Sequence, residues 1–266
     1  MIAQNARTVS NRAIAVIDIG NTSIALGRWD AGRVADRAAV PTTDGAAFDV
    51  GYAELSATFR RGRPAAVAVA SVVPAALAHV RAVVNDALDK DPLVVGDRLP
   101  LPMDVGVTDP KAIGTDRVCA AAAAYDQLQG ACAVVDIGTA VTLDIVDDDG
   151  TLLGGAILPG LRLQLRALHE HTAQLPDVPP DMPQHPYGRN TREAIQAGVC
   201  GGLVGTIRGL VEAYASRLNK WPHVVATGGD VAMLRERLDF VDSVVPDLTL
   251  LGIGLAYARY LGAQGA

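Results

Sequence analysis

Two stretches of the chain place an acid, a glycine and hydroxyl side chains directly after a strongly apolar run. They are AVIDIGNTSIALG, residues 15–27, and AVVDIGTAVTLDIV, residues 133–146. Glycine lets the backbone take turn geometry and lets a ligand approach, and neighbouring N–H groups can bind phosphate oxygens. A carboxylate beside a phosphate needs a cation between them. Asp18 and Asp136 are therefore candidate ligands for Mg²⁺ or a monovalent ion.

Either stretch alone could be only a hairpin turn, because Asp, Gly and Asn are preferred turn residues. Two copies, each following a buried strand and each opening a unit of three strands, favour a functional interpretation. Two lobes with facing hairpins would form a cleft that holds the phosphates of a nucleotide from both sides. The sequence offers no G-x-x-x-x-G-K-[ST] loop, no protein-kinase H-R-D or D-F-G motif and no strand-linked G-x-G-x-x-G as an alternative.

A third candidate is AIGTDR, residues 112–117, which places an acid beside an arginine at the start of an alanine-rich segment. In a purely structural interpretation, Thr115 caps the following helix and Asp116 stabilises its N-terminus. In a functional one, Asp116 accepts the proton of a substrate hydroxyl while Arg117 holds an anionic or polar part of the substrate. The residues alone leave both interpretations open.

The composition restricts the class of protein and its partners. The chain has 266 residues, half of them apolar, and a net charge of −6, which argues against nucleic-acid binding. We expect no membrane span and no secretory leader, and therefore a soluble, cytoplasmic protein. The three cysteines lie far apart among small apolar residues, as buried thiols in a reducing compartment do.

The elements that must position these motifs form two similar halves, each with three antiparallel strands followed by α/β alternation. In the first half we expect strands at 13–18, 23–29, 33–40 and 65–73, and helices at 46–60 and 74–88. In the second we expect strands at 133–136, 141–146, 154–158 and 223–227, and helices at 160–175, 191–218, 231–238 and 248–261. The expected division is a disordered lead-in at 1–12, an N-terminal lobe at 13–114 and a C-terminal lobe at 115–266.

The paired D-x-G-[NT] hairpins resemble the phosphate motifs of the acetate-kinase, sugar-kinase, Hsp70 and actin superfamily. An ordered set of further stretches is similar to the type III pantothenate kinases in particular: GTDR (114–117), DIGTAVTLD (136–144), GGAILPGL (154–161), NTREAIQAGV (190–199) and TGGD (227–230). The resemblance runs from about residue 14 to the C-terminus. It implies an α/β fold of two ribonuclease H-like, actin-like lobes with a nucleotide cleft between them.

By this resemblance the chain would phosphorylate pantothenate with ATP and Mg²⁺ to give 4'-phosphopantothenate, the first step of coenzyme A biosynthesis. Asp116 would be the catalytic base, and Asp136 would hold a monovalent cation, K⁺ or NH₄⁺. The implied ATP contacts are Asp18, Ile19, Gly20, Asn21, Thr22, Ser23, Ile24, Ala25 and Thr139. The implied substrate contacts are Gly114, Thr115, Asp116, Arg117 and Thr191. The adenosine would lie near Gly228 and Gly229.

The family also implies a homodimer, for which residues 191–214 and 120–128 are candidate interfaces, although core packing explains both equally well. Val107 stands where family members often carry an aromatic residue, and Asp109 stands in place of an asparagine. Two other functions stay open: a small-molecule kinase of the same superfamily, such as a sugar kinase, and an accessory transcriptional regulator of the Bvg accessory factor type.

Overall fold

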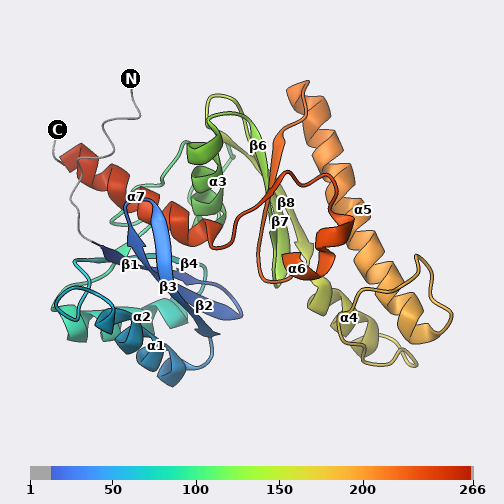
Figure 1. Ribbon diagram of the computed structural model, residues 1–266, viewed down its shortest axis with the longest axis horizontal. Coiled ribbons are helices and arrows are strands. Elements are labelled where there is room, and N and C mark those ends of the chain that lie inside the picture. Colours follow the sequence, from blue (N-terminus) through green and yellow to red (C-terminus); the bar gives the residue numbers. More distant parts are fainter. Residues whose placement is uncertain (1–12, 265–266) are drawn as a thin grey trace. The chain divides into compact units, whose positions relative to one another are not determined.

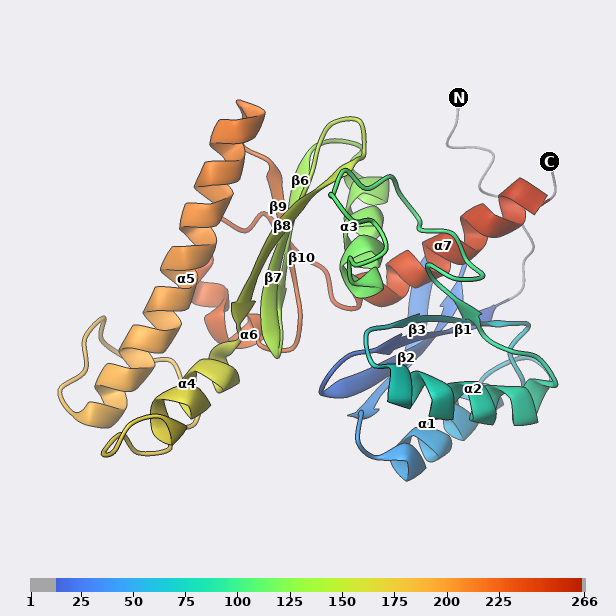
Figure 2. The ribbon, with the colours of Figure 1, turned by 180° about the vertical axis from the view of Figure 1, so that it is seen from behind.

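A computed structural model describes residues 13–264 (Figures 1 and 2), so the lead-in expected at residues 1–12 lies outside the described residues. The contacts divide the chain into two units. Unit 1 comprises the residues up to Gln127 and those from Asp247 onward, and unit 2 comprises Leu128–Pro246.

Unit 1 is built on a five-stranded sheet in the order β3-β2-β1-β4-β5. Strands β1, β2 and β3 are antiparallel neighbours, whereas β4 and β5 run parallel to β1. The bounds of its elements are β1 Ile14–Ile19, β2 Ser23–Asp30, β3 Arg33–Pro41, α1 Gly45–Ala57, β4 Val67–Ser71, α2 Pro74–Leu88, β5 Leu93–Val94, α3 Thr115–Leu128 and α7 Leu248–Gln264.

Strand β1 is apolar throughout because both faces of its sheet are covered. Ile17 and its alternate neighbours pack into a cluster with Phe48 and Val80 of helices α1 and α2. Val16, on the other face, packs with Cys119 of α3 and Ile253 of α7. Successive side chains of a strand point to opposite faces, so a strand between two helical layers must be apolar at every position. Its one acid, Asp18, falls at the end of the strand.

Unit 2 repeats the arrangement with the sheet order β10-β9-β6-β7-β8, in which β6, β7 and β8 are antiparallel and β9 and β10 run parallel to β6. The bounds of its elements are β6 Cys132–Ile137, β7 Ala140–Val146, β8 Leu152–Pro159, α4 Leu161–Glu170, α5 Thr191–Leu218, β9 His223–Thr227, α6 Val231–Leu234, the 3-10 turn Arg235–Arg237 and β10 Ser243–Val244. Counted in chain order within each unit, both sheets read 3-2-1-4-5. The duplicated fold expected from the sequence is therefore present.

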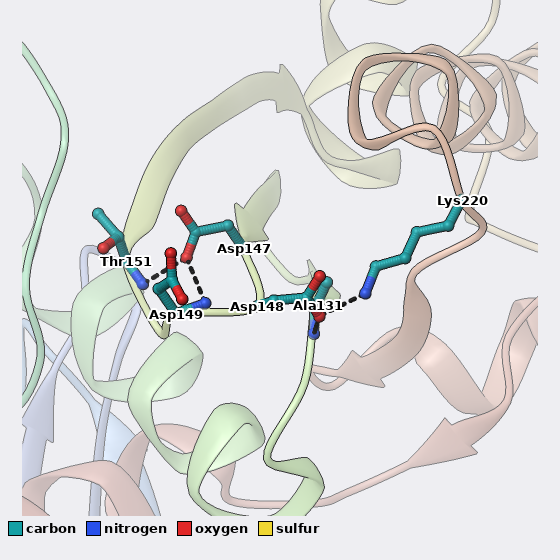
Figure 3. Close-up of polar contacts among 6 residues, drawn as sticks. All are labelled: Ala131, Asp147, Asp148, Asp149, Thr151 and Lys220. Carbon is teal, nitrogen blue, oxygen red and sulfur yellow. Dashed lines mark hydrogen bonds and ion pairs between the residues drawn. The ribbon is translucent and has the colours of Figure 1, made fainter.

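The turn that joins β7 to β8 is fixed by its own carboxylates (Figure 3). Asp147 accepts hydrogen bonds from the backbone N–H groups of Asp149 and Thr151, at 3.1 and 2.9 Å. Asp148 accepts one from Ala131 N–H at 3.1 Å and pairs with Lys220. The side-chain hydrogen bond from Lys220 and the backbone one hold the pKa of the Asp148 carboxyl below its usual value.

The division between the units differs from the expected boundary at residue 114, because α3 and α7 pack with the first sheet. The glycines of α7 make this contact possible. A methyl group on Gly252 would overlap the backbone of Cys119 in α3, and one on Gly254 would overlap the Trp29 ring of β2. The final helix therefore belongs to unit 1, although it follows unit 2 in the sequence.

Helix α5 is the one helix in the described part of the chain whose length and apolar composition would suffice to cross a membrane. No such segment was expected from the sequence. In the fold, its apolar residues have a structural explanation, because Ile195, Val199, Leu203 and Ile207 belong to the buried core of unit 2. A core helix needs such a stripe to cover a sheet.

Candidate functional site

The first candidate corner lies between β1 and β2. Asp18 is the second-to-last residue of β1, where it pairs with Ala25 of β2 and Ala70 of β4. The turn closes through a hydrogen bond from Gly20 N–H to Ser23 O at 3.0 Å. Thr42, beyond β3, donates its hydroxyl to Gly20 O at 2.7 Å and so fixes the turn from the side. The polar residues at the tip, Asn21, Thr22 and Ser23, are exposed.

The segment Gly114–Arg117 is held at the carboxyl ends of β1 and β4. Ser71, the last residue of β4, pairs with Ile19 of β1 and donates its N–H to the Thr115 hydroxyl at 3.3 Å. Asp116 stands at the N-terminus of α3, and its carboxylate accepts the N–H of Arg117 at 2.8 Å. A methyl group on Gly114 would overlap the Asp116 carboxylate, so a larger residue there would require this side chain to move.

The two candidate acids of unit 1, Asp18 and Asp116, belong to segments that the fold brings together. The Cys119 thiol is fully buried, and its pKa is raised by burial first and by the negative charges of Asp18 and Asp116 second. Because Ser71 pairs with Ile19 of β1 and donates its N–H to the Thr115 hydroxyl, unit 1 brings together the β1–β2 corner and the G-x-D-R segment, which are about a hundred residues apart in the sequence.

The second candidate corner, between β6 and β7, has the same construction. Asp136 is the second-to-last residue of β6 and pairs with Thr142 and Thr227. Its turn closes through Gly138 N–H to Ala140 O at 3.1 Å, and Thr139 at the tip is exposed.

Two further glycines pack tightly around this corner. Gly160 donates its N–H to Thr139 O at 3.0 Å, and a methyl group on it would overlap the turn backbone. Gly228 follows β9 with φ +102°, and a methyl group there would overlap the Asp136 carboxylate and lie 2.5 Å from Ile137 O. The segment Gly228–Asp230 therefore lies directly against Asp136, and Arg162 of α4 reaches Asp230 at 3.7 Å.

Thr191, the remaining predicted substrate contact, is the exposed first residue of α5. A capping pair stands at the start of this helix. Asn190 accepts the Glu193 N–H at 3.0 Å, and the Glu193 carboxylate accepts the Arg189 N–H at 2.8 Å. Among residues 13–264, the Thr191 side chain forms no hydrogen bond that would join it to the Asp136 corner.

The described residues include no group of three or more His, Cys, Asp or Glu side chains that could hold a metal ion by themselves. A Mg²⁺ ion in a phosphate site takes one or two protein carboxylates and completes its shell with phosphate oxygens and water. Asp18 in unit 1 and Asp136 in unit 2 each place one carboxylate beside a strand-to-strand turn. A cage of protein ligands for a transition metal is not present in this part of the chain.

Ser71 and Thr42 were not singled out from the sequence, and Gly160 was quoted only as part of the stretch at 154–161, without a role. Ser71 could have been found from the sequence, because it ends a buried strand that is a neighbour of β1. Parallel strands bring their carboxyl ends to one edge of a sheet, where ligands bind. Thr42 and Gly160 act through backbone contacts with distant turns, for which the sequence carries no periodic signal.

The order 3-2-1-4-5, the acidic turn after the first strand of each sheet and the duplication define an α/β fold of two ribonuclease H-like units. A solved structure from Campylobacter jejuni, described as a conserved putative Baf family transcriptional activator, has the same fold, with a TM-score of 0.60 and 18% identity over 94% of this chain and all of that one. The ethanolamine utilization protein EutJ of Carboxydothermus hydrogenoformans also matches, with a TM-score of 0.52 over 95% of this chain and 92% of that one, at 15% identity.

The family follows from sequence comparison. The profile of the type III pantothenate kinases matches residues 14–213. A type III pantothenate kinase of Thermomicrobium roseum is 34% identical over 94% of this chain and 99% of the relative, and one of Gluconobacter oxydans is 35% identical over 93% of both. The chain belongs to the type III pantothenate kinase family.

Proposed function

We propose that the chain transfers the γ-phosphate of ATP to the primary hydroxyl of pantothenate, with Asp116 as the catalytic base. Membership of the family supports the reaction. The residue assignment is supported by the contact that holds the Asp116 segment at the carboxyl ends of β1 and β4, where Ser71 pairs with Ile19 and donates its N–H to the Thr115 hydroxyl.

In the proposed step, the pantothenate hydroxyl oxygen attacks the γ-phosphorus and its proton passes to the Asp116 carboxylate. The bond between the γ-phosphorus and the bridging oxygen breaks, and ADP leaves with the electron pair. Positioning and neutralisation of charge supply most of the catalysis in such a transfer, so an ordinary carboxylate suffices as the base. The exposed N–H groups and hydroxyls of a turn such as β1–β2 suit phosphate oxygens.

The binding roles follow the family motifs. Residues 18–25 and Thr139 contact ATP, while residues 114–117 and Thr191 contact pantothenate. Mg²⁺ accompanies the ATP phosphates and neutralises their charge. Asp136 holds a monovalent cation, K⁺ or NH₄⁺, and Gly228 fixes the position of that carboxylate by packing against it.

The proposal includes a homodimer in the cytoplasm, with α5 as the contact between subunits. The other candidate interface is not available, because Ala120–Ala124 of α3 are buried within unit 1. On α5, a methyl group added to any of five glycines would meet no atom outside the helix within 4 Å: these are Gly198, Gly201, Gly202, Gly205 and Gly209. A second helix can approach such a face closely. Neither a sugar-kinase activity nor a regulatory role is favoured by the sequence relatives.

The test is an ADP-release assay with pantothenate, comparing Asp116→Asn with Asp104→Asn as a matched control. Asp104 is an exposed acid twelve residues earlier in the chain. Asp116→Asn should lower kcat by about 10²–10⁴-fold and leave ATP binding, measured by calorimetry, nearly unchanged. Full turnover in this variant would remove Asp116 as the base. Equal wild-type rates in K⁺ and Na⁺ buffers would remove the monovalent cation from the proposal.

A further inference from the structure

Unit 1 contains a cavity of about 1020 Å³ that none of the family motifs uses. It lies at the amino ends of β1, β4 and β5, where Ala13, Ala66 and Leu93 line it. Asp18 and Ser71 stand at the opposite, carboxyl ends of β1 and β4. The cavity is therefore separate from the Asp116 site within the same unit.

The lining of this cavity is strongly basic in a chain that is acidic as a whole. Six of the 23 lysines and arginines line it, against two acids, Asp30 and Asp91. The rest of the chain holds 17 lysines and arginines against 27 acids. The six cations are Arg28, Arg60, Arg61, Arg63, Lys90 and Arg98.

Most of this positive charge is not neutralised by the fold. Arg28 pairs with Asp36, at 2.6 Å. The other five cations form no ion pair with any residue of the described range 13–264. Cations gathered in one hollow repel one another, and this repulsion is relieved by a bound anion.

The loop that carries three of these cations begins at a buried residue and contains a hydrogen-bonded turn. Phe59 at its start is buried, and Gly62 N–H donates to Phe59 O at 2.8 Å. Arg61 has φ +87°, in the left-handed region that a side chain with a Cβ rarely adopts.

We propose that this cavity binds a small anion that carries at least two phosphate groups. With Arg28 paired to Asp36, the lining keeps a net charge of +3, and each phosphate group carries about 1.5 to 2 negative charges at pH 7, so about two groups balance it. The volume is at the upper end of the range for small-molecule sites and exceeds what a single phosphate needs. Beside the cations, Phe59, Val84 and Leu88 give an apolar lining. The acidic surface elsewhere disfavours an extended nucleic acid, which needs cations along its path.

The test is calorimetric titration of the full chain with sodium tripolyphosphate in EDTA, without ATP or pantothenate. Its outcome is therefore independent of the kinase activity. The triple variant Arg60→Ala, Arg61→Gly, Arg63→Ala removes three cations and places at residue 61 a glycine, which suits its φ. The matched control, Arg33→Ala, Arg217→Ala, Arg235→Ala, removes three exposed arginines outside the cavity.

We expect the triple variant to bind tripolyphosphate at least about tenfold more weakly than the wild type, which corresponds to 1.4 kcal/mol. The affinity of the control variant should stay within about twofold of the wild-type affinity. Lys90→Glu with Arg98→Glu, on separate loops, should show the same loss if the triple variant fails to fold. Wild-type binding should weaken as salt is raised. Equal affinities of triple variant and control would overturn the proposal. So would tighter binding of a single-stranded oligonucleotide than of tripolyphosphate at these residues.

Discussion

Gly228 provides the sharpest test of how the Asp136 corner is built, because replacing it with alanine adds one methyl group at a known place. Its φ of +102° lies in the left-handed region. A Cβ there would lie 2.5 Å from Ile137 O and 2.6 Å from Ile137 N, and would overlap the Asp136 carboxylate. The carboxylate could move, but the two Ile137 atoms belong to the backbone of the central strand β6.

The cost of Gly228→Ala has two parts. Placing a residue with a Cβ at a left-handed φ costs about 1–2 kcal/mol, and forcing a methyl group into a packed site costs about 1–3 kcal/mol. We expect the free energy of unfolding to fall by roughly 2–5 kcal/mol, which at an m-value of about 2 kcal/mol per M lowers the urea midpoint by about 1–2.5 M. Circular dichroism during urea titration measures this shift.

Gly229 is the matched control, since a methyl group on it would meet no atom within 4 Å and its φ is not in the left-handed region. Gly229→Ala should leave the midpoint nearly where it is. If both variants unfold at the same urea concentration, Gly228 does not pack against β6 as described. The inference that Gly228 fixes the position of the Asp136 carboxylate would then be wrong as well.

Three further expectations concern the thiols, a helix cap and the β7–β8 turn. All three cysteines are buried, so a thiol reagent at pH 8 should label none of them in the folded chain and all three in guanidinium. Burial raises the pKa of Cys132 to about 12, whereas an unfolded thiol ionises at about 8.5. The contribution of Cys132 to the free energy of unfolding should therefore fall as the pH rises from about 8.5 toward 12. Asn190→Ala should cost about 1 kcal/mol in urea titration, whereas Arg192→Ala beside it should cost much less. Asp148→Asn should lower the melting temperature at pH 7, because it removes the charge that pairs with Lys220. The difference in melting temperature from the wild type should shrink as the pH falls through the lowered pKa of Asp148, since the wild-type carboxylate then becomes protonated. A constant difference from pH 7 to 3 would contradict this reasoning.

The local elements around the candidate site could be predicted from the sequence with good boundaries. The expected helix at 191–218 is α5, and the expected strand at 223–227 is β9. Both acids of the paired motifs lie where strand alternation and turn residues place them, one residue before the end of β1 and β6. Short-range signals determine these features, since apolar periodicity and capping residues act within a few positions.

Features that depend on long-range packing could not be predicted. The pattern of α7 indicates an apolar helix but not which sheet it covers, and this depends on the contacts of Gly252 and Gly254. The expected boundary at residue 114 differs for that reason. The basic cavity was not expected either, because its cations come from four separate segments and the overall charge is negative.

The return of α7 to the first sheet means that unit 2 is an insertion, with unit 1 formed from two pieces of chain that enclose it in the sequence. During synthesis, every strand of both sheets therefore leaves the ribosome before α7, the helix that completes the cover of the first sheet. Until the last segment emerges, the face of β1 that carries Val16 lacks part of its cover. A nascent chain stalled before α7 emerges should attract chaperones at that surface, even though every strand of both sheets has already been made.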